Sequence, residues 1–174
     1  MLILLAILLL PAIEGKNKVF VVPHSHNDVG WLVTIDECYT RYCKHILNNM
    51  FDLLNSRQSL KFCWSEIVFL SMWLEEYPEK KPILIDLIQQ NRFEIIGGGW
   101  VQNDEALPDF ELVLRQMEAG FAFARQELNV SRISIGWQLD PFGHSTLTSS
   151  LFERLGFDSL VFARVDYRFK VFLN

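Results

Sequence analysis

The sequence has few cysteines and no basic stripe, and these shortages exclude several classes of protein. Only Cys38, Cys43 and Cys63 occur among 174 residues, an odd number whose spacing does not fit a zinc knuckle. Cys38 and Cys43 lie five residues apart on a predicted helix and are not expected to face each other well, so buried thiols and a disulfide to a segment further along the protein both remain open. The net charge of −5 without a Lys/Arg stripe argues against nucleic acid as a partner.

The chain also lacks internal repeats, low-complexity linkers and an apolar run long enough for a stable membrane span, which takes about 20 residues. The aliphatic run at residues 1–10 is shorter and is typical of a secretory signal peptide, so residues 1–15 are predicted to be one. This run has no Lys or Arg near its start, and a buried strand or helix is the alternative. The sequon at Asn129 makes that residue a candidate glycosylation site and agrees with a secretory route.

The apolar content and the order of the segments predict a folded α/β domain. Half of the residues are apolar and 13% are aromatic, which excludes a disordered chain. Short apolar runs alternate with helical patterns, which is typical of right-handed βαβ units and a parallel sheet. Pro108 is expected in the first turn of its helix and Gly156 at the end of the last one. Strands are expected at 18–22, 59–64, 92–96, 132–135 and 159–162, and helices at 35–54, 66–76, 82–91, 108–128 and 146–155.

The most informative motif is the pair His26 and Asp28, which follows the first predicted strand. Ligands and catalytic groups collect at the carboxyl ends of parallel strands. Residues i and i+2 of an extended chain point to the same side, so the two side chains can converge on one ion. An imidazole nitrogen with a carboxylate oxygen suits zinc. Taken alone, such a pair can also be a hydrogen-bonded histidine and a capping aspartate.

A second acid, Asp140, ends another strand-like run, immediately before a proline-glycine turn. It has the same place relative to its strand as Asp28, so two acid-bearing strand ends can form one metal and catalytic site. Arg164 follows the last predicted strand, where a guanidinium can hold a carboxylate bidentately. Its alternative role is a surface pair with Asp166.

Four segments in this order resemble the zinc-dependent class II α-mannosidases of glycoside hydrolase family 38, closer to the lysosomal branch than to the Golgi branch. The similarity covers about residues 18–170. It implies a parallel β/α barrel-like catalytic domain, of which residues 16–174 would supply the N-terminal part with about five strands. The remainder would be a downstream part of the same enzyme. The four segments are Pro23-His24-Ser25-His26-Asn27-Asp28-Val29-Gly30-Trp31, Gly98-Gly99-Trp100-Val101-Gln102-Asn103-Asp104-Glu105-Ala106, Asp140-Pro141-Phe142-Gly143-His144-Ser145 and Arg164-Val165-Asp166-Tyr167.

The resemblance implies a metal site with a nucleophile in it. His26, Asp28 and Asp140 would bind Zn²⁺, and Asp140 would also form the glycosyl-enzyme ester of a retaining reaction. His144 would orient Asp140 or cap the next helix. The fourth zinc ligand and the general acid/base of the family have no counterpart among these residues.

The resemblance also implies a set of residues that bind a mannose-containing oligosaccharide: Trp31, Phe142, Arg164 and Asp104. Aromatic faces stack on the apolar face of a sugar ring, whereas core packing is the alternative for Trp31. Asp104 would be a pocket acid or part of a solvated helix entrance. Glu66 follows the second strand and could touch the pocket.

Together these features predict a retaining zinc-dependent α-mannosidase that hydrolyses terminal α-mannosides of N-glycans or glycoprotein oligosaccharides. The signal peptide and the sequon place it in the secretory pathway, as a lysosomal or secreted enzyme. The alternative is a non-catalytic product, either a truncated isoform or a fragmentary gene model, without turnover by itself. A retaining glycosidase needs two carboxyl groups, and only one of them is recognisable here.

Overall fold

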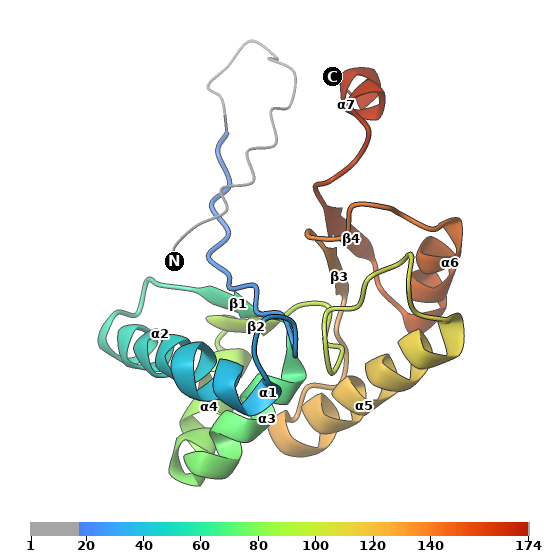
Figure 1. Ribbon diagram of the computed structural model, residues 1–174. Helices are drawn as coiled ribbons and strands as arrows, with labels where there is room; N and C mark the ends of the chain where they lie inside the picture. The colour runs from blue at the N-terminus through green and yellow to red at the C-terminus, as the bar shows by residue number, and fades with distance from the viewer. Residues whose placement is uncertain (1–17, 174) are drawn as a thin grey trace.

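The computed structural model describes residues 18–173, in which short parallel strands alternate with helices (Figure 1). The predicted signal peptide at 1–15 lies outside these residues. The elements in chain order are α1 (Ile35–Cys38), η1 (Tyr39–Cys43), α2 (Lys44–Ser56), β1 (Phe62–Trp64), α3 (Ile67–Glu76), η2 (Pro78–Lys80), α4 (Lys81–Gln89), β2 (Phe93–Ile95), α5 (Phe110–Leu128), β3 (Ile135–Gln138), α6 (Thr146–Leu155), β4 (Ser159–Phe162) and α7 (Tyr167–Leu173).

The strands form two parallel pairs. β1 pairs with β2, with Phe62 opposite Phe93, and β3 pairs with β4, with Ile135 opposite Ser159. Each pair is joined through helices, as parallel neighbours require. The prediction of an α/β fold with parallel strands is therefore confirmed for the described residues, but as two two-stranded sheets.

Single contacts join these pairs into one row of neighbours. The Gly97 N–H, just after β2, donates to the Ile135 carbonyl at the start of β3 across 2.7 Å. On the other side of the row, His24 forms a parallel bridge with Cys63 of β1. Parallel pairing makes the segments that follow His24, β1 and β2 emerge toward one edge, and those that follow β3 and β4 share the edge of the second pair, which the Gly97 hydrogen bond joins to the first. This edge carries the predicted site residues.

The segment at 18–22 is exposed extended chain, and the prediction of a buried strand there is wrong. Val19, Phe20 and Val21 expose 66%, 64% and 67% of their surface. The register explains the difference, because His24 lies opposite Cys63 and the same offset places 18–22 opposite 57–61. β1 begins only at Phe62, so no strand lies there to accept or donate ladder hydrogen bonds.

The other predicted elements are present. The helix at 146–155 and the strand at 159–162 have the predicted bounds, and the rest have shifted ends. The strands expected at 59–64 and 92–96 shorten to three residues each, and the one expected at 132–135 begins at Ile135. Helix α5 begins at Phe110, because the Asp109 carboxylate accepts the Leu112 N–H at 2.9 Å and caps it. Pro108 therefore precedes the cap and does not lie in the first turn. Helix α7 was not predicted.

The core lies between the strands and the helices that cover them. Helices α1 to α5 lie on one side of β1 and β2, and α6 lies beside β3 and β4, whereas α7 and the segment at 18–22 extend away from the body (Figure 1). Trp64, Phe69 and Trp73 are fully buried in this core. No helix in the described part of the chain is long and apolar enough to cross a bilayer.

Helix α5 approaches the loop after β2 at Gly120. A Cβ built there would lie 2.0 Å from the Gly98 carbonyl oxygen, which is backbone and cannot rotate away. We expect Gly120→Ala to lower the free energy of unfolding by about 1–3 kcal/mol, the range of an overpacked core. The roughly 1 kcal/mol that alanine gains over glycine in a helix is the smaller effect.

Gly143→Ala is the matched control for this substitution, because a Cβ there meets nothing within 4 Å. Urea denaturation of both variants measures the difference. Equal stability of the two variants would show that α5 and the loop after β2 do not touch at Gly120.

Candidate metal and catalytic site

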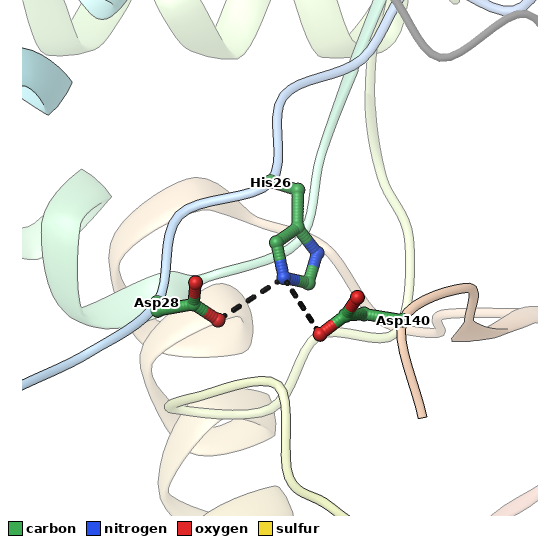
Figure 2. A group of neighbouring side chains, drawn as sticks. All are labelled: His26, Asp28 and Asp140. Carbon is green, nitrogen blue, oxygen red and sulfur yellow. Dashed lines mark hydrogen bonds and ion pairs between the residues drawn. The ribbon is translucent and has the colours of Figure 1, made fainter. Parts of the chain in front are cut away.

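The structure brings His26, Asp28 and Asp140 together at the edge where the parallel strands end (Figure 2). His26 Nε2 lies 3.2 Å from Asp28 Oδ1 and 3.6 Å from Asp140 Oδ2. The three potential ligand atoms all lie within 4.8 Å of one another. Two separate segments contribute them, the extended chain after the His24 bridge and the residues after β3.

The geometry of this group suits a metal ion. Zinc ligands at about 2.0–2.2 Å in a tetrahedral arrangement lie roughly 3.3–3.6 Å from one another. The two measured N···O distances of 3.2 and 3.6 Å are close to that separation. The His26 side chain is 28% exposed, and those of Asp28 and Asp140 are 45% and 36% exposed, so an ion can reach them. One imidazole with two carboxylates leaves room for a further ligand, as catalytic zinc sites do.

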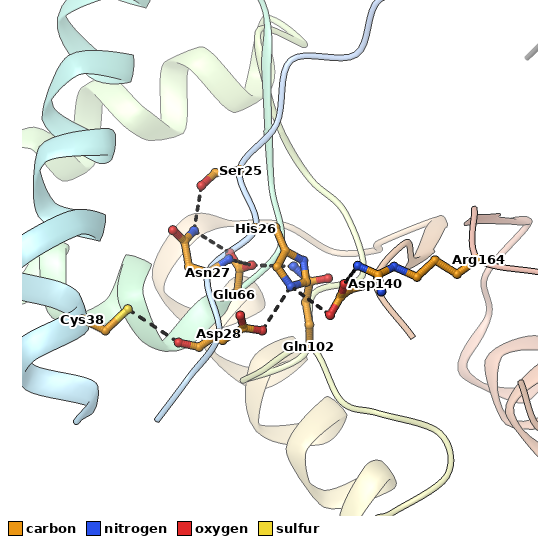
Figure 3. A network of polar contacts seen from close by, with 9 residues as sticks. All are labelled: Ser25, His26, Asn27, Asp28, Cys38, Glu66, Gln102, Asp140 and Arg164. Carbon is orange, nitrogen blue, oxygen red and sulfur yellow. Dashed lines mark hydrogen bonds and ion pairs between the residues drawn. The ribbon is translucent and has the colours of Figure 1, made fainter. Parts of the chain in front are cut away.

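Arg164 holds the other oxygen of Asp140 (Figure 3). Its guanidinium Nη2 lies 2.7 Å from Asp140 Oδ1 and forms an ion pair with it, while Oδ2 faces His26. The guanidinium carbon also lies 5.6 Å from the centre of the Phe142 ring. The alternative pair of Arg164 with Asp166 is not formed, because Asp166 binds Arg168, and hydrogen bonds from Arg168 lower the pKa of that carboxyl. The arginine therefore fixes the orientation of Asp140.

A fully buried carboxyl group, Glu66, lies behind the loop that carries His26 and Asp28 (Figure 3). The Asn27 backbone N–H donates to Glu66 Oε1 at 2.9 Å, and the Gln102 side-chain amide donates to the same oxygen. Burial raises the pKa of Glu66, and these hydrogen bonds oppose the shift. Glu66 is thus a backbone anchor and does not itself join the group of potential ligands.

His144 lies between two other loops and takes neither of the roles predicted for it. Its Nδ1 lies 2.9 Å from Glu105 Oε1 and its Nε2 lies 3.0 Å from the Arg164 carbonyl oxygen. Ser145, not His144, caps α6. The Glu105 side chain is only 2% exposed and also accepts the Ser145 N–H at 2.7 Å. His144 and Glu105 therefore connect the loops after β2, β3 and β4.

The four predicted substrate-binding residues are placed differently from one another. Trp31 and Phe142 are 73% and 75% exposed, so core packing as the alternative for Trp31 is wrong. Phe142 and Arg164 are beside Asp140, whereas Asp104 is exposed and its carboxylate has no partner among the described residues. Asn129 is exposed, with φ 58°, in the turn that ends α5.

Cys38 and Cys43 face each other, contrary to the expectation from their spacing. Their sulfur atoms lie 3.7 Å apart as free thiols. The chain between them forms a π-helical turn at Tyr39–Cys43, and i→i+5 bonding brings residues five apart onto one face. The Cys38 thiol also donates to the Asp28 carbonyl oxygen at 3.5 Å. Helix α1 thus contacts the loop that carries Asp28.

Comparison with known proteins finds relatives over almost the whole chain. Residues 16–172 match the family described as "Glycosyl hydrolases family 38 N-terminal domain". The chain is 43% identical over 158 residues to alpha-mannosidase C of Dictyostelium discoideum, covering 90% of this chain and 15% of the relative. It is 41% identical over 155 residues to alpha-mannosidase 2 of Mus musculus, covering 88% of this chain and 13% of the relative. The chain thus spans about a seventh of the length of these curated relatives.

Solved structures share the fold of this part. An alpha-mannosidase from Enterococcus faecalis V583 superimposes with a TM-score of 0.71 at 23% identity, over 81% of this chain and 16% of that one. A 4-alpha-glucanotransferase from Thermococcus litoralis gives a TM-score of 0.62 at 20% identity, over 80% and 21%. These likenesses show the fold of this part, while the sequence relatives carry the family assignment. Through its N-terminal domain, the chain belongs to glycosyl hydrolase family 38, the family of the class II α-mannosidases.

Proposed function

We propose that these residues form the zinc- and nucleophile-bearing part of a retaining α-mannosidase. The observation that supports this most directly is the convergence of His26, Asp28 and Asp140 from two segments more than a hundred residues apart. The row of neighbours from His24 to β4 would be continued by further strands into a β/α barrel-like domain. The substrates would be terminal α-mannosides of N-glycans or glycoprotein oligosaccharides, met in the lysosome or outside the cell.

The residues have separate parts in this reaction. Asp140 attacks the anomeric carbon, and a bond forms between its carboxylate oxygen and the sugar as the glycosidic bond breaks. Arg164 keeps the carboxylate oriented through the ion pair at 2.7 Å. Trp31 and Phe142 offer exposed aromatic faces on which the sugar ring can stack. A bound Zn²⁺ would act as template and Lewis acid toward the sugar hydroxyls.

The proton for the leaving oxygen must come from a second carboxyl group. Asp28 is committed to the metal in this proposal, Glu105 is held by Ser145 and His144, and Asp104 does not join the group. The acid/base would therefore belong to another part of the enzyme. This same feature supports the second candidate, a chain that binds metal but has no turnover by itself.

Zn²⁺ binding by an Asp28 variant tests this proposal, because Asp28 has no role in forming the bond to the sugar. Loss of a residue that hydrogen-bonds a metal ligand weakens metal affinity roughly 10- to 100-fold. Asp28→Ala removes a ligand itself, so we expect it to weaken Zn²⁺ affinity by more than that. Competition with a chromophoric chelator measures the change. Asp104→Ala is the matched control and should leave the affinity unaltered, since this exposed carboxylate lies outside the group. Equal losses in both variants would show that the metal lies elsewhere.

A further inference from the structure

We propose that Glu66 is the positioning residue of the metal site, and that it sets His26 and Asp28 in the geometry that an ion requires. This inference rests on the proposed metal function. Glu66 does not lie within the group of potential ligands, and it reaches them only through the backbone between them. Glu66 restricts the conformation of the loop at 25–28, which the ion would otherwise have to order when it binds.

Asn27 lies between the two potential ligands His26 and Asp28. In extended chain, alternate residues point to opposite sides, so an inward-pointing Asn27 turns His26 and Asp28 outward together. Asn27 is only 8% exposed, and its N–H donates to Glu66 Oε1 at 2.9 Å. Its side-chain amide donates to Glu66 Oε2 at 3.4 Å and to Ser25 Oγ at 2.8 Å. The backbone N–H and the side-chain amide of Asn27 are therefore both held on the side of Glu66.

Glu66 is itself held from several sides. It has no exposed surface, it is the N-cap position of α3, and its carbonyl accepts the Trp64 indole N–H at 2.8 Å. Gln102, from the loop after β2, donates to its carboxylate. One side chain thus joins the loop at 25–28 to the ends of β1 and β2. A ligand pair mounted on such an anchor loses little conformational freedom when the ion binds.

Three N–H groups point at this carboxylate, two from Asn27 and one from Gln102. A carboxylate is an acceptor at both oxygens, whereas a glutamine amide presents one oxygen and one NH₂. Glu66→Gln keeps the size and the packing but places a donor opposite another donor. The loop must then shift, and His26 and Asp28 shift with it.

The test compares Zn²⁺ affinity and Co²⁺ absorption for the full chain and its variants. We expect Glu66→Gln to weaken Zn²⁺ binding about tenfold or more, as loss of an outer partner of a ligand does. The intensity of the Co²⁺ d–d bands should change as the geometry is distorted, which a mere loss of stability would not cause. Glu76→Gln is the matched control, since Glu76 binds Tyr39 and Lys44 on the helices and does not contact the loop.

A second variant keeps the proposal testable if Glu66→Gln fails to fold. Gln102→Leu removes one donor, and it also removes a buried Gln102 oxygen that has no hydrogen-bond partner, so it should fold. We expect a smaller loss of affinity, about threefold, because both Asn27 contacts remain. Unaltered zinc affinity and Co²⁺ bands in Glu66→Gln, or in Gln102→Leu if only that variant folds, would overturn the positioning role and leave the metal site standing. Absence of zinc binding by the parent chain would overturn the site and this inference together.

Discussion

Asp140→Asn is expected to abolish α-mannoside hydrolysis in a full-length enzyme that carries these residues. Asparagine keeps the size of the side chain but cannot attack the anomeric carbon, and it weakens the metal group at the same time. Removal of a nucleophile that acts as part of a unit costs roughly 10⁴- to 10⁶-fold in kcat. A suitable host is alpha-mannosidase C of Dictyostelium discoideum with residues 18–172 of this chain in place of its matching segment, given their 43% identity.

Two measurements check this expectation. An aryl α-mannoside assay gives the turnover, and a fluorinated mannosyl probe, which traps the glycosyl-enzyme ester, should label the parent hybrid at Asp140. Asp86→Asn, on the exposed face of α4, is the matched control and should keep full activity. Labelling of a peptide without Asp140, or turnover by the Asn variant close to that of the parent, would remove the role assigned to this residue.

The chain of 174 residues by itself is expected to show no mannosidase turnover above background. Without an acid to protonate the leaving oxygen, general acid catalysis worth about 10²–10⁴-fold is lost. Without a further protein ligand, the ion and the sugar are held less firmly against Asp140. Exposed apolar residues such as Phe20, Trp31 and Phe172 add a tendency to associate.

The assay uses an aryl α-mannoside with added Zn²⁺ and protein shown to be free of host glycosidases. The active hybrid serves as the positive control. Turnover by the chain that disappears in Asp140→Asn would contradict this expectation. It would mean that an acid within these residues, with Asp104 and Glu105 as the first to examine, supplies the proton.

The site residues could be predicted from the sequence because the features that place them are local. His26 and Asp28 share a side by the alternation of extended chain, and Asp140 follows a strand-like run. Parallel topology then brings the two segments to one edge, and the structure places their atoms within 4.8 Å. Arg164 follows β4 for the same reason and pairs with Asp140. The zinc-binding and nucleophilic roles of these residues stay predictions.

What could not be predicted depends on contacts between distant segments. The exposure of 18–22 follows from the register of His24 on Cys63, which no local pattern encodes. The meeting of Cys38 and Cys43 follows from one π-helical turn, which helix periodicity does not reveal. The sequence indicates only that Glu66 is a polar residue next to a strand end. Its full burial beneath Asn27 arises from tertiary contacts.

The most direct test of a metal site at these residues is an anomalous diffraction map at the zinc absorption edge, from crystals of this chain grown with Zn²⁺. The account predicts one strong peak about 2.0–2.2 Å from His26 Nε2 and from one carboxylate oxygen each of Asp28 and Asp140. A map without a peak there, with His26 still in direct contact with the two carboxylates, would contradict it.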